Sequence, residues 1–316
     1  MSDDSSLDFP FPHRRSRHHA HAAARHRSWL DRHRALADVA DATAYGHWEV
    51  AELAALSHPA VGPDELALAA DMLGFFFLFD DQFDSELGRR PAEVARICDR
   101  LTDILHGTLP DGSSDVERAF ADLWRRSTAG MPGRWRARAA ANWEWYFASH
   151  PAEAAGRRSA RIPDRDGYLT LRRGTAAMET IFDMLERLGG FTVPQSTFHH
   201  PVLRRLRQVA ADIPSFSNDV RSYPLEAPRG DVYNLVMIVQ RERACPPEEA
   251  CAVVLAEAQL MVEDYARLLA ELPCAFRELE LDEEQRGIAQ RYADGITAWL
   301  AGYLHWERRT GRYRTG

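Results

Sequence analysis

Residues 74–84 read GFFFLFDDQFD, and this stretch is the most unusual in the chain. Asp80 and Asp84 lie four residues apart, so they share one face of a helix, and Asp81 lies at the edge of that face. Carboxylate oxygens suit Mg²⁺, which usually takes one or two of them together with water and substrate phosphate. The stretch therefore predicts an apolar helix that ends in a metal-binding box, although an acidic turn on an ordinary core helix fits the same letters.

Outward from this stretch the pattern is helical almost everywhere. Apolar residues recur at spacings of three and four, and Ala, Leu, Arg and Glu are common. Clusters of Pro and Gly separate the periodic segments and predict loops there. We expect an all-α, single-domain bundle over residues 29–316, with helices near 29–43, 47–57, 63–85, 90–106, 114–129, 132–151, 166–188, 198–223, 230–242, 246–271 and 283–309.

Residues 1–28 are predicted to form an N-terminal arm. Phe9-Pro10-Phe11-Pro12 is extended, because proline disfavours helix in the residue before it. Residues 13–27 are rich in Arg and His. A metal-binding run is one reading of this composition. A solvated, partly helical basic arm is the favoured one, and such an arm could also fold over a pocket that holds an anion.

The overall composition excludes several classes of protein. The chain has 316 residues, of which 45% are hydrophobic and 27% charged, which is typical of a globular fold. Its net charge of −8 argues against a dedicated nucleic-acid protein. All 39 basic residues are arginine, which excludes chemistry that needs a catalytic lysine. The four cysteines form no C-x-x-C pair, and neither a signal core nor a membrane-length apolar run is present, so a cytoplasmic location is expected.

A second candidate metal box lies about 140 residues further along the chain. Asn218, Ser222 and Glu226 are spaced at i, i+4 and i+8, so on a helix their oxygens form one stripe. Pro224 lies inside this stripe, and we expect the helix to end or kink there. A polar helix end fits the letters as well, and only a fold that brings two helices together makes one site of both boxes.

Several arginines are placed to receive a diphosphate. Arg172 precedes Gly174, whose position predicts a break or a close approach within its helix. Arg229 follows the second box, and Arg312 stands beside Tyr313 near the C-terminus. Guanidinium groups suit bidentate recognition of phosphate. In a chain with so many arginines, only their position relative to the two boxes distinguishes these from surface residues.

Taken together, these motifs resemble the bacterial class I terpene synthases of the sesquiterpene cyclase kind. The resemblance covers nearly the whole chain and rests on the following segments, in this order: the FPFP arm, FFFLFDDQFD, YLTLRRGT, NDVRSYPLE, GDVYNLV and the final RY. It implies a helical bundle around a deep apolar active-site cavity. It also implies a cluster of three Mg²⁺ ions that binds the diphosphate of an isoprenoid substrate.

The resemblance also implies roles for single residues. The metal ligands are Asp80, Asp84, Asn218, Ser222 and Glu226; the diphosphate is bound by Arg172, Arg229, Arg312 and Tyr313; Thr175 and Ala176 occupy the linker and effector positions. The chain departs from the family pattern in two places. The effector position is often glycine, and a lysine that often precedes the triad glutamate is replaced by Leu225.

The predicted activity is that of a sesquiterpene synthase. The enzyme ionises farnesyl diphosphate with Mg²⁺ and cyclises the carbocation to a hydrocarbon or an alcohol, with release of diphosphate. Aromatic faces stabilise the migrating charge, for which Phe76, Phe77 and Trp306 are the candidates. The alternatives are a synthase that uses geranyl or geranylgeranyl diphosphate, a chain-elongating prenyl synthase and a catalytically idle isoprenoid-binding protein. A monomer and a homodimer both fit the sequence.

Overall fold

The computed structural model describes residues 7–36, 42–108 and 112–313. Within these ranges the chain is helical and has no β-strand, as the sequence predicted. The first half contains α1 (His19–His33), α2 (Ala42–His47), α3 (Val50–Ser57), α4 (Pro63–Asp81), the 3₁₀ turns η1 (Gln82–Asp84) and η2 (Glu86–Arg89), α5 (Pro91–Leu105), α6 (Asp115–Thr128) and α7 (Gly133–Ser159). The second half contains α8 (Arg165–Thr175), α9 (Met178–Gly189), α10 (Gln195–Phe198), α11 (Pro201–Arg229), α12 (Leu235–Arg243), α13 (Pro247–Glu278), α14 (Glu283–Glu307) and η3 (Gly311–Tyr313).

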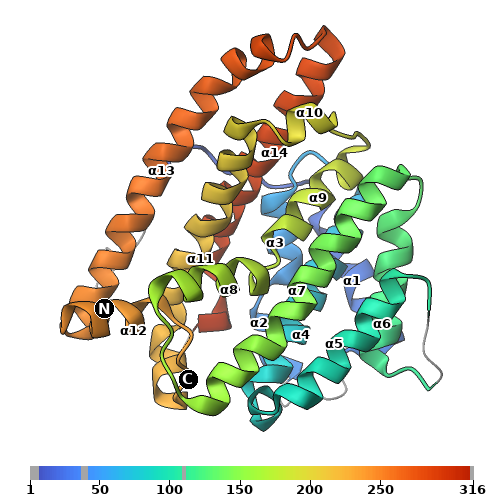
Figure 1. The fold of residues 1–316 in the computed structure, drawn as a ribbon. Coiled ribbons are helices and arrows are strands. Elements are labelled where there is room, and N and C mark those ends of the chain that lie inside the picture. Colours follow the sequence, from blue (N-terminus) through green and yellow to red (C-terminus); the bar gives the residue numbers. More distant parts are fainter. Residues whose placement is uncertain (1–6, 37–41, 109–111, 314–316) are drawn as a thin grey trace.

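Helix α4 lies in the interior of the bundle. All its residues from Leu66 to Phe76 are buried, as is Phe79, because the helix is apolar on every side. It packs against α1, α3, α6 and α9. Helices α5 and α7 pair on one side of the molecule, and α11 and α13 pair on the other, with α8 between α7 and α11 (Figure 1). The carboxyl end of α4 therefore lies between the two halves of the bundle.

Helix starts follow the local signals more closely than helix ends do. Proline occupies the first turn of α4, α5, α11 and α13, where its missing N–H costs nothing. Side-chain capping boxes begin α6 and α14. Helix α4 ends at Asp81 rather than near residue 85, because the chain tightens into η1. The segment predicted as one helix over 166–188 is two helices, α8 and α9, that break at Ala176 and Ala177.

The predicted end or kink at Pro224 is wrong in one respect. Helix α11 continues through Pro214, Pro224 and Pro228 to Arg229. It packs against α13, α12 and α14 along this length, and this tertiary packing overrides the local cost of the prolines. Glu226 is therefore presented by the same helix as Asn218 and Ser222.

The described part of the N-terminal segment is docked on the bundle. Asp8 and Gln259 of α13 exchange two hydrogen bonds of 2.9 and 3.0 Å. Helix α1 runs across residue 28, so the predicted boundary between an arm and the domain falls inside a helix. Its side chains Ala22, His26 and Trp29 are buried in the same core as α4. No helix in the described ranges is both long and apolar enough to span a bilayer.

Candidate active site

The two boxes face one hollow at the end of α4. This hollow consists of two adjoining chambers, which share Asp80, Arg172, Thr175, Asn218 and Arg312 in their walls. The polar chamber has a volume of about 120 Å³ and is also lined by Asp81, Asp84 and Glu226. The inner chamber has a volume of about 130 Å³ and a mostly apolar wall. Residues about 140 positions apart in the chain thus meet at one place, as facing helices of a bundle allow.

The first box, Asp80, Asp81 and Asp84, lies at the end of α4 and in η1. Asp80 accepts hydrogen bonds from the Tyr146 hydroxyl at 2.6 Å and from His150 Nε2 at 3.1 Å. Asp81 accepts two from Arg312, at 2.5 and 3.2 Å. Asp81 and Asp84 are therefore each paired with a guanidinium group, since Asp84 accepts a hydrogen bond from Arg229.

The carboxyl of Asp84 lies close to the negative charge of Asp81. Its partner is Arg229 Nη1 at 3.2 Å. Burial of the carboxyl, together with the negative charge of Asp81, raises the pKa of Asp84 to about 6. A bound divalent cation would reverse this effect, because it favours the ionised carboxylate.

The second box, Asn218, Ser222 and Glu226, lies along one stripe of α11. Asn218 Oδ1 accepts a hydrogen bond from Arg172 at 2.7 Å, and its Nδ2 donates to the Tyr313 hydroxyl at 2.7 Å. Glu226 accepts one from Asn234 Nδ2 at 2.9 Å. Burial, followed by the charge of Asp219, raises the pKa of Glu226 to about 7.

The hydroxyl of Ser222 gives the strongest support for a cation site at the second box. Ser222 Oγ is buried and has no hydrogen bond of acceptable geometry within the described part of the chain. It nevertheless lies close enough to Glu226 to lower the pKa of that carboxyl. Buried polar atoms nearly always have a partner, so an unsatisfied oxygen beside a carboxylate fits a hard cation such as Mg²⁺. In the described ranges no group of three or more His, Cys, Asp or Glu side chains is arranged so that it could hold a metal ion.

Unsatisfied donors face this acceptor-rich site. Arg172 Nε and Arg157 Nε are both buried without a hydrogen-bond partner among the described residues. Both arginines line the polar chamber. An anion with several oxygens would satisfy such donors, as phosphate groups do. The chamber therefore offers hard oxygens for cations and guanidinium groups for an anion.

The inner chamber is lined by aromatic and aliphatic side chains. Phe76 stacks on Trp143 with 4.9 Å between ring centroids. Phe77 stacks on Trp306 at 5.5 Å, and the guanidinium carbon of Arg312 lies 4.6 Å from the centre of the Phe77 ring. Phe76 and Phe77 line the chamber, whereas Trp306 supports Phe77 from behind and contributes nothing to this wall.

The break between α8 and α9 forms another part of the wall. Thr175, Ala176 and Ala177 all line the inner chamber. Ala176 is in the right-handed region, with φ of −73°, but Ala177 has φ of +55°, which L-residues other than Gly, Asn and Asp rarely adopt. The predicted close approach is at Gly174, where an added Cβ would lie 1.9 Å from Ser149 Oγ.

The structure thus groups most of the predicted site residues. Three of them stand apart from the chamber walls: Ser222, which is buried next to Glu226; Arg229, which pairs with Asp84 from outside; and Trp306. The sequence analysis missed Tyr146 and His150, which hold Asp80, and Trp299 and Tyr303, which line the inner chamber. Each pair is spaced at i, i+4, and that spacing of polar or aromatic residues on one helix face was the available signal.

Comparisons with known proteins agree with this geometry. A family model described as terpene synthase family 2, C-terminal metal binding, matches residues 71–264. Pristinol synthase of Streptomyces pristinaespiralis is 33% identical over 314 residues, which is 98% of this chain and 84% of that protein. Pentalenene synthase of Streptomyces avermitilis is 34% identical over 99% of this chain and 94% of its own length. The crystal structure of germacradien-4-ol synthase from Streptomyces citricolor superimposes with a TM-score of 0.92 and 62% identity, covering 98% of this chain and 100% of that one.

Proposed function

Because the chain belongs to terpene synthase family 2, we propose that it converts farnesyl diphosphate into a cyclic sesquiterpene and releases diphosphate. The observation that carries this proposal is the shared wall of the two chambers. Five side chains border both the polar chamber and the aromatic inner chamber. A substrate with an anionic head and an apolar tail fits such a pair of compartments.

We propose that the polar chamber holds Mg²⁺ ions, three by family resemblance, on Asp80, Asp84, Asn218, Ser222 and Glu226. Magnesium supplies charge stabilisation for the departing diphosphate. The unsatisfied Ser222 hydroxyl and the crowded carboxyls support this ligand set. All five ligands are oxygen donors, as Mg²⁺ prefers.

The arginines are proposed to bind the diphosphate after a change of partner. Arg172, Arg229 and Arg312 contact Asn218, Asp84 and Asp81 respectively. Each predicted diphosphate ligand is thus paired with a member of a metal box. Once the boxes bind cations, these guanidinium groups are released toward the phosphate oxygens, which they match in geometry. The Tyr313 hydroxyl, which accepts a hydrogen bond from Asn218, is proposed to turn toward the diphosphate together with Arg312.

The same exchange prepares the inner chamber for a carbocation. Arg312 lies over the faces of Phe77 and Trp48, at 4.6 and 4.5 Å. When it moves to the diphosphate, the Phe77 face is free to stabilise positive charge, a contact worth about 0.5–2 kcal/mol. Phe76 offers a second ring, and Ala176 presents its backbone at the helix break. The apolar wall excludes water from the cation.

The chamber must also widen when the substrate binds. Its volume of about 130 Å³ is below the roughly 300–1,000 Å³ typical of pockets that enclose an organic ligand. Release of Arg312 from the shared wall opens the inner chamber toward the polar chamber.

The sequence supports a cytoplasmic enzyme, and the four cysteines are unpaired in the structure.

The test is product analysis. Purified protein is incubated with geranyl, farnesyl or geranylgeranyl diphosphate, with Mg²⁺ or with EDTA, and the extracts are analysed by gas chromatography and mass spectrometry. The expected result is a cyclic C15 product that disappears with EDTA. A product from another substrate would keep the reaction class and replace farnesyl diphosphate. A folded sample that makes no product from any of the three would favour an isoprenoid-binding protein.

A further inference from the structure

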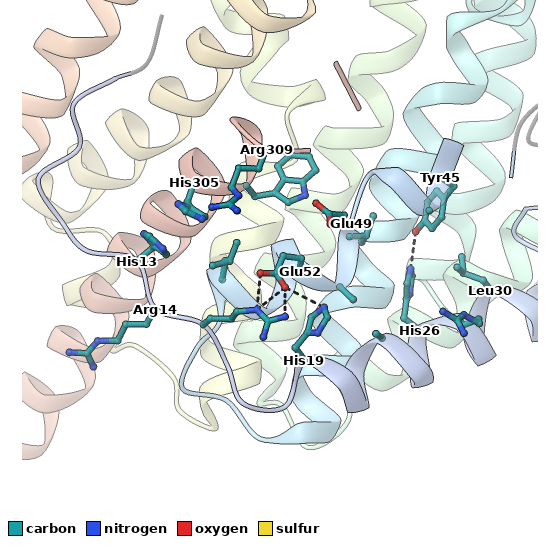
Figure 2. A pocket seen from close by; sticks show the side chains of 18 of the residues that line it. His13, Arg14, His19, His26, Leu30, Tyr45, Glu49, Glu52, His305 and Arg309 are labelled. Carbon is teal, nitrogen blue, oxygen red and sulfur yellow. Dashed lines mark hydrogen bonds and ion pairs between the residues drawn. The ribbon is translucent and has the colours of Figure 1, made fainter. Parts of the chain in front are cut away.

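A third cavity lies outside the proposed active site and is much larger than either chamber. It has a volume of about 950 Å³ and is bounded by the segment before α1, by α1 itself, by α3 and by the C-terminal end of α14 (Figure 2). Trp306 separates it from the inner chamber, since this ring lines the cavity and also stacks on Phe77. The cavity therefore lies one aromatic ring away from the site already described.

The charges that line this cavity are mostly positive. Among the described residues, its wall contains four arginines, four histidines and two glutamates, Glu49 and Glu52. Glu52 is already engaged, because it pairs with Arg15 at 2.7 Å and with His19 at 3.3 Å. Within the described ranges Arg14, Arg27 and Arg309 have no carboxylate partner. An unbalanced set of cations in a concave site concentrates positive potential there.

One end of the cavity brings several of these cations together. His13 and His305 stack with 3.7 Å between ring centroids, and Figure 2 shows Arg309 beside them. Burial lowers the pKa of His305, and the positive charges of His13 and Arg309 lower it further. The permanent charge of Arg309 beside these two rings favours an anion at this end of the cavity. A metal site is a poor alternative, because the two imidazoles stack face to face instead of directing their nitrogens at one point.

The remaining wall has a different character. Leu30, Val50 and Leu56 are buried apolar side chains that also line the cavity, and Figure 2 shows Leu30 at the end away from the histidine pair. The volume lies within the range of pockets that bind organic ligands. A pocket with a cationic end and an apolar wall fits a small molecule with an anionic group and an apolar body. Nucleic acid is a poor candidate, since the whole chain carries a net charge of −8.

We propose that this cavity binds a small phosphate-bearing anion, with Arg309, His305 and His13 as the main contacts. The fork of Arg309 matches phosphate oxygens, and each imidazole, even when neutral, can donate one N–H to the anion. The ligand class is defined by its phosphate chemistry, whether as free inorganic diphosphate or as an organic diphosphate whose tail lies on the apolar wall. This site is independent of the metal boxes, and its ligand needs no Mg²⁺.

The test is isothermal titration of the full chain in EDTA, with inorganic diphosphate in one arm and geranyl diphosphate in the other. We expect binding in at least one arm. Arg309→Gln should weaken it about tenfold or more, since it removes a bidentate contact. Tighter binding of geranyl diphosphate would identify an organic ligand, and equal binding would identify inorganic diphosphate. Absence of binding in both arms would overturn the proposal.

Two control variants separate this cavity from general electrostatics and from the active site. Arg308→Gln removes the same charge one residue away, from a side chain that does not line the cavity but whose charge reaches His305, and should weaken binding much less than Arg309→Gln does. Arg172→Gln alters the proposed active site and should leave the affinity unchanged. If Arg308→Gln weakened binding as much as Arg309→Gln, or if only Arg172→Gln did so, the assignment to this cavity would be wrong. Melting temperatures equal to that of the wild type establish that each variant is folded.

Discussion

The two boxes differ in how firmly the protein holds them. In the first box the side chains of Asp80 and Asp84 are 42% and 43% exposed, and η1 and η2 follow as short 3₁₀ turns. The second box lies inside one long helix, next to Asp219, which is buried. Only one side of the site is therefore fixed before any ligand arrives.

Asp219 explains the rigidity of the second box. Its carboxylate accepts hydrogen bonds from the Tyr168 hydroxyl and from Leu235 N, and it pairs with Arg172 at 3.3 Å. Its backbone carbonyl accepts another from Asn234 Nδ2 at 2.8 Å. Helices α8, α11 and α12 are joined at this one residue. From this difference we expect that, if the proposed Mg²⁺ ions bind, the second box keeps its position and the first box is the one that moves.

The largest expected effect concerns stability. Asp219→Ala leaves the buried Tyr168 hydroxyl and the buried Leu235 N–H without their acceptor and removes the carboxylate that pairs with Arg172, which together cost about 3–5 kcal/mol. The matched variant in the first box is Asp81→Ala, which frees Arg312. We expect it to cost about 1 kcal/mol, because Asp81 is partly exposed and Arg312 keeps its ring contacts. Urea unfolding without metal measures both, and equal losses would remove the distinction between the boxes.

Turnover should depend on both boxes despite this difference in rigidity. Asp80→Asn removes the negative charge of one proposed ligand and Asn218→Ala removes another ligand altogether, so each should lower kcat about 100-fold or more. Glu86→Gln is the control, since Glu86 is an exposed carboxylate just beyond the first box. Initial rates with farnesyl diphosphate at saturating Mg²⁺ provide the measurement. Wild-type turnover in both ligand variants would refute the metal assignment.

Hydrogen exchange can detect the closing of the first box. Mg²⁺ and diphosphate together should raise the protection of amides in residues 82–90 about tenfold or more, because these short turns gain fixed partners. Amides around Asn218 should change little, since they lie inside α11 in a buried network. Mg²⁺ alone and diphosphate alone are the controls and should have small effects. A similar gain in both regions would mean that neither box is fixed beforehand.

Much of this arrangement could be predicted from local patterns. The periodicity predicted the helices, and the spacing of oxygens placed the second box on one helix face. The same prediction is wrong for the first box, because α4 ends at Asp81 and Asp84 lies in η1. Helix continuation past Pro224 could not be predicted, because packing against α12, α13 and α14 decides it. The pairing of Arg312 with Asp81 likewise joins residues 231 positions apart. Such contacts depend on the assembled bundle and leave no periodic signal.

The aromatic residues also show that contacts between helices cannot be predicted from local sequence patterns. Phe76 and Phe77 were chosen because they precede the aspartates by one turn, and both line the inner chamber. Trp306 was predicted as a further candidate without a spacing argument. Its ring is turned to the back of Phe77 and donates a hydrogen bond to the Trp48 carbonyl at 2.7 Å. Residue type and spacing identify a face of a helix, but the neighbouring helices decide what that face meets.

The smallest effect concerns the helix break that joins the two sides of the site. Ala177→Gly and Ala176→Gly add the same backbone freedom to the unfolded chain, which costs each variant about 0.4–1 kcal/mol. Only Ala177 has a positive φ, so only its replacement relieves the left-handed strain of about 1–2 kcal/mol. Glycine is also better than alanine at the start of α9.

Ala177→Gly should therefore be more stable than Ala176→Gly by about 1–2 kcal/mol in urea unfolding. The comparison cancels the entropy that both variants share, so the difference reports the strain at this one position. Equal stabilities would show that the backbone at Ala177 is not strained. This part of the inner chamber wall would then store no conformational energy. If the expected difference is found, the break is held in a strained conformation by its neighbours. It is then as rigid as the second box, to which Arg172, one turn earlier, is joined through Asn218 and Asp219.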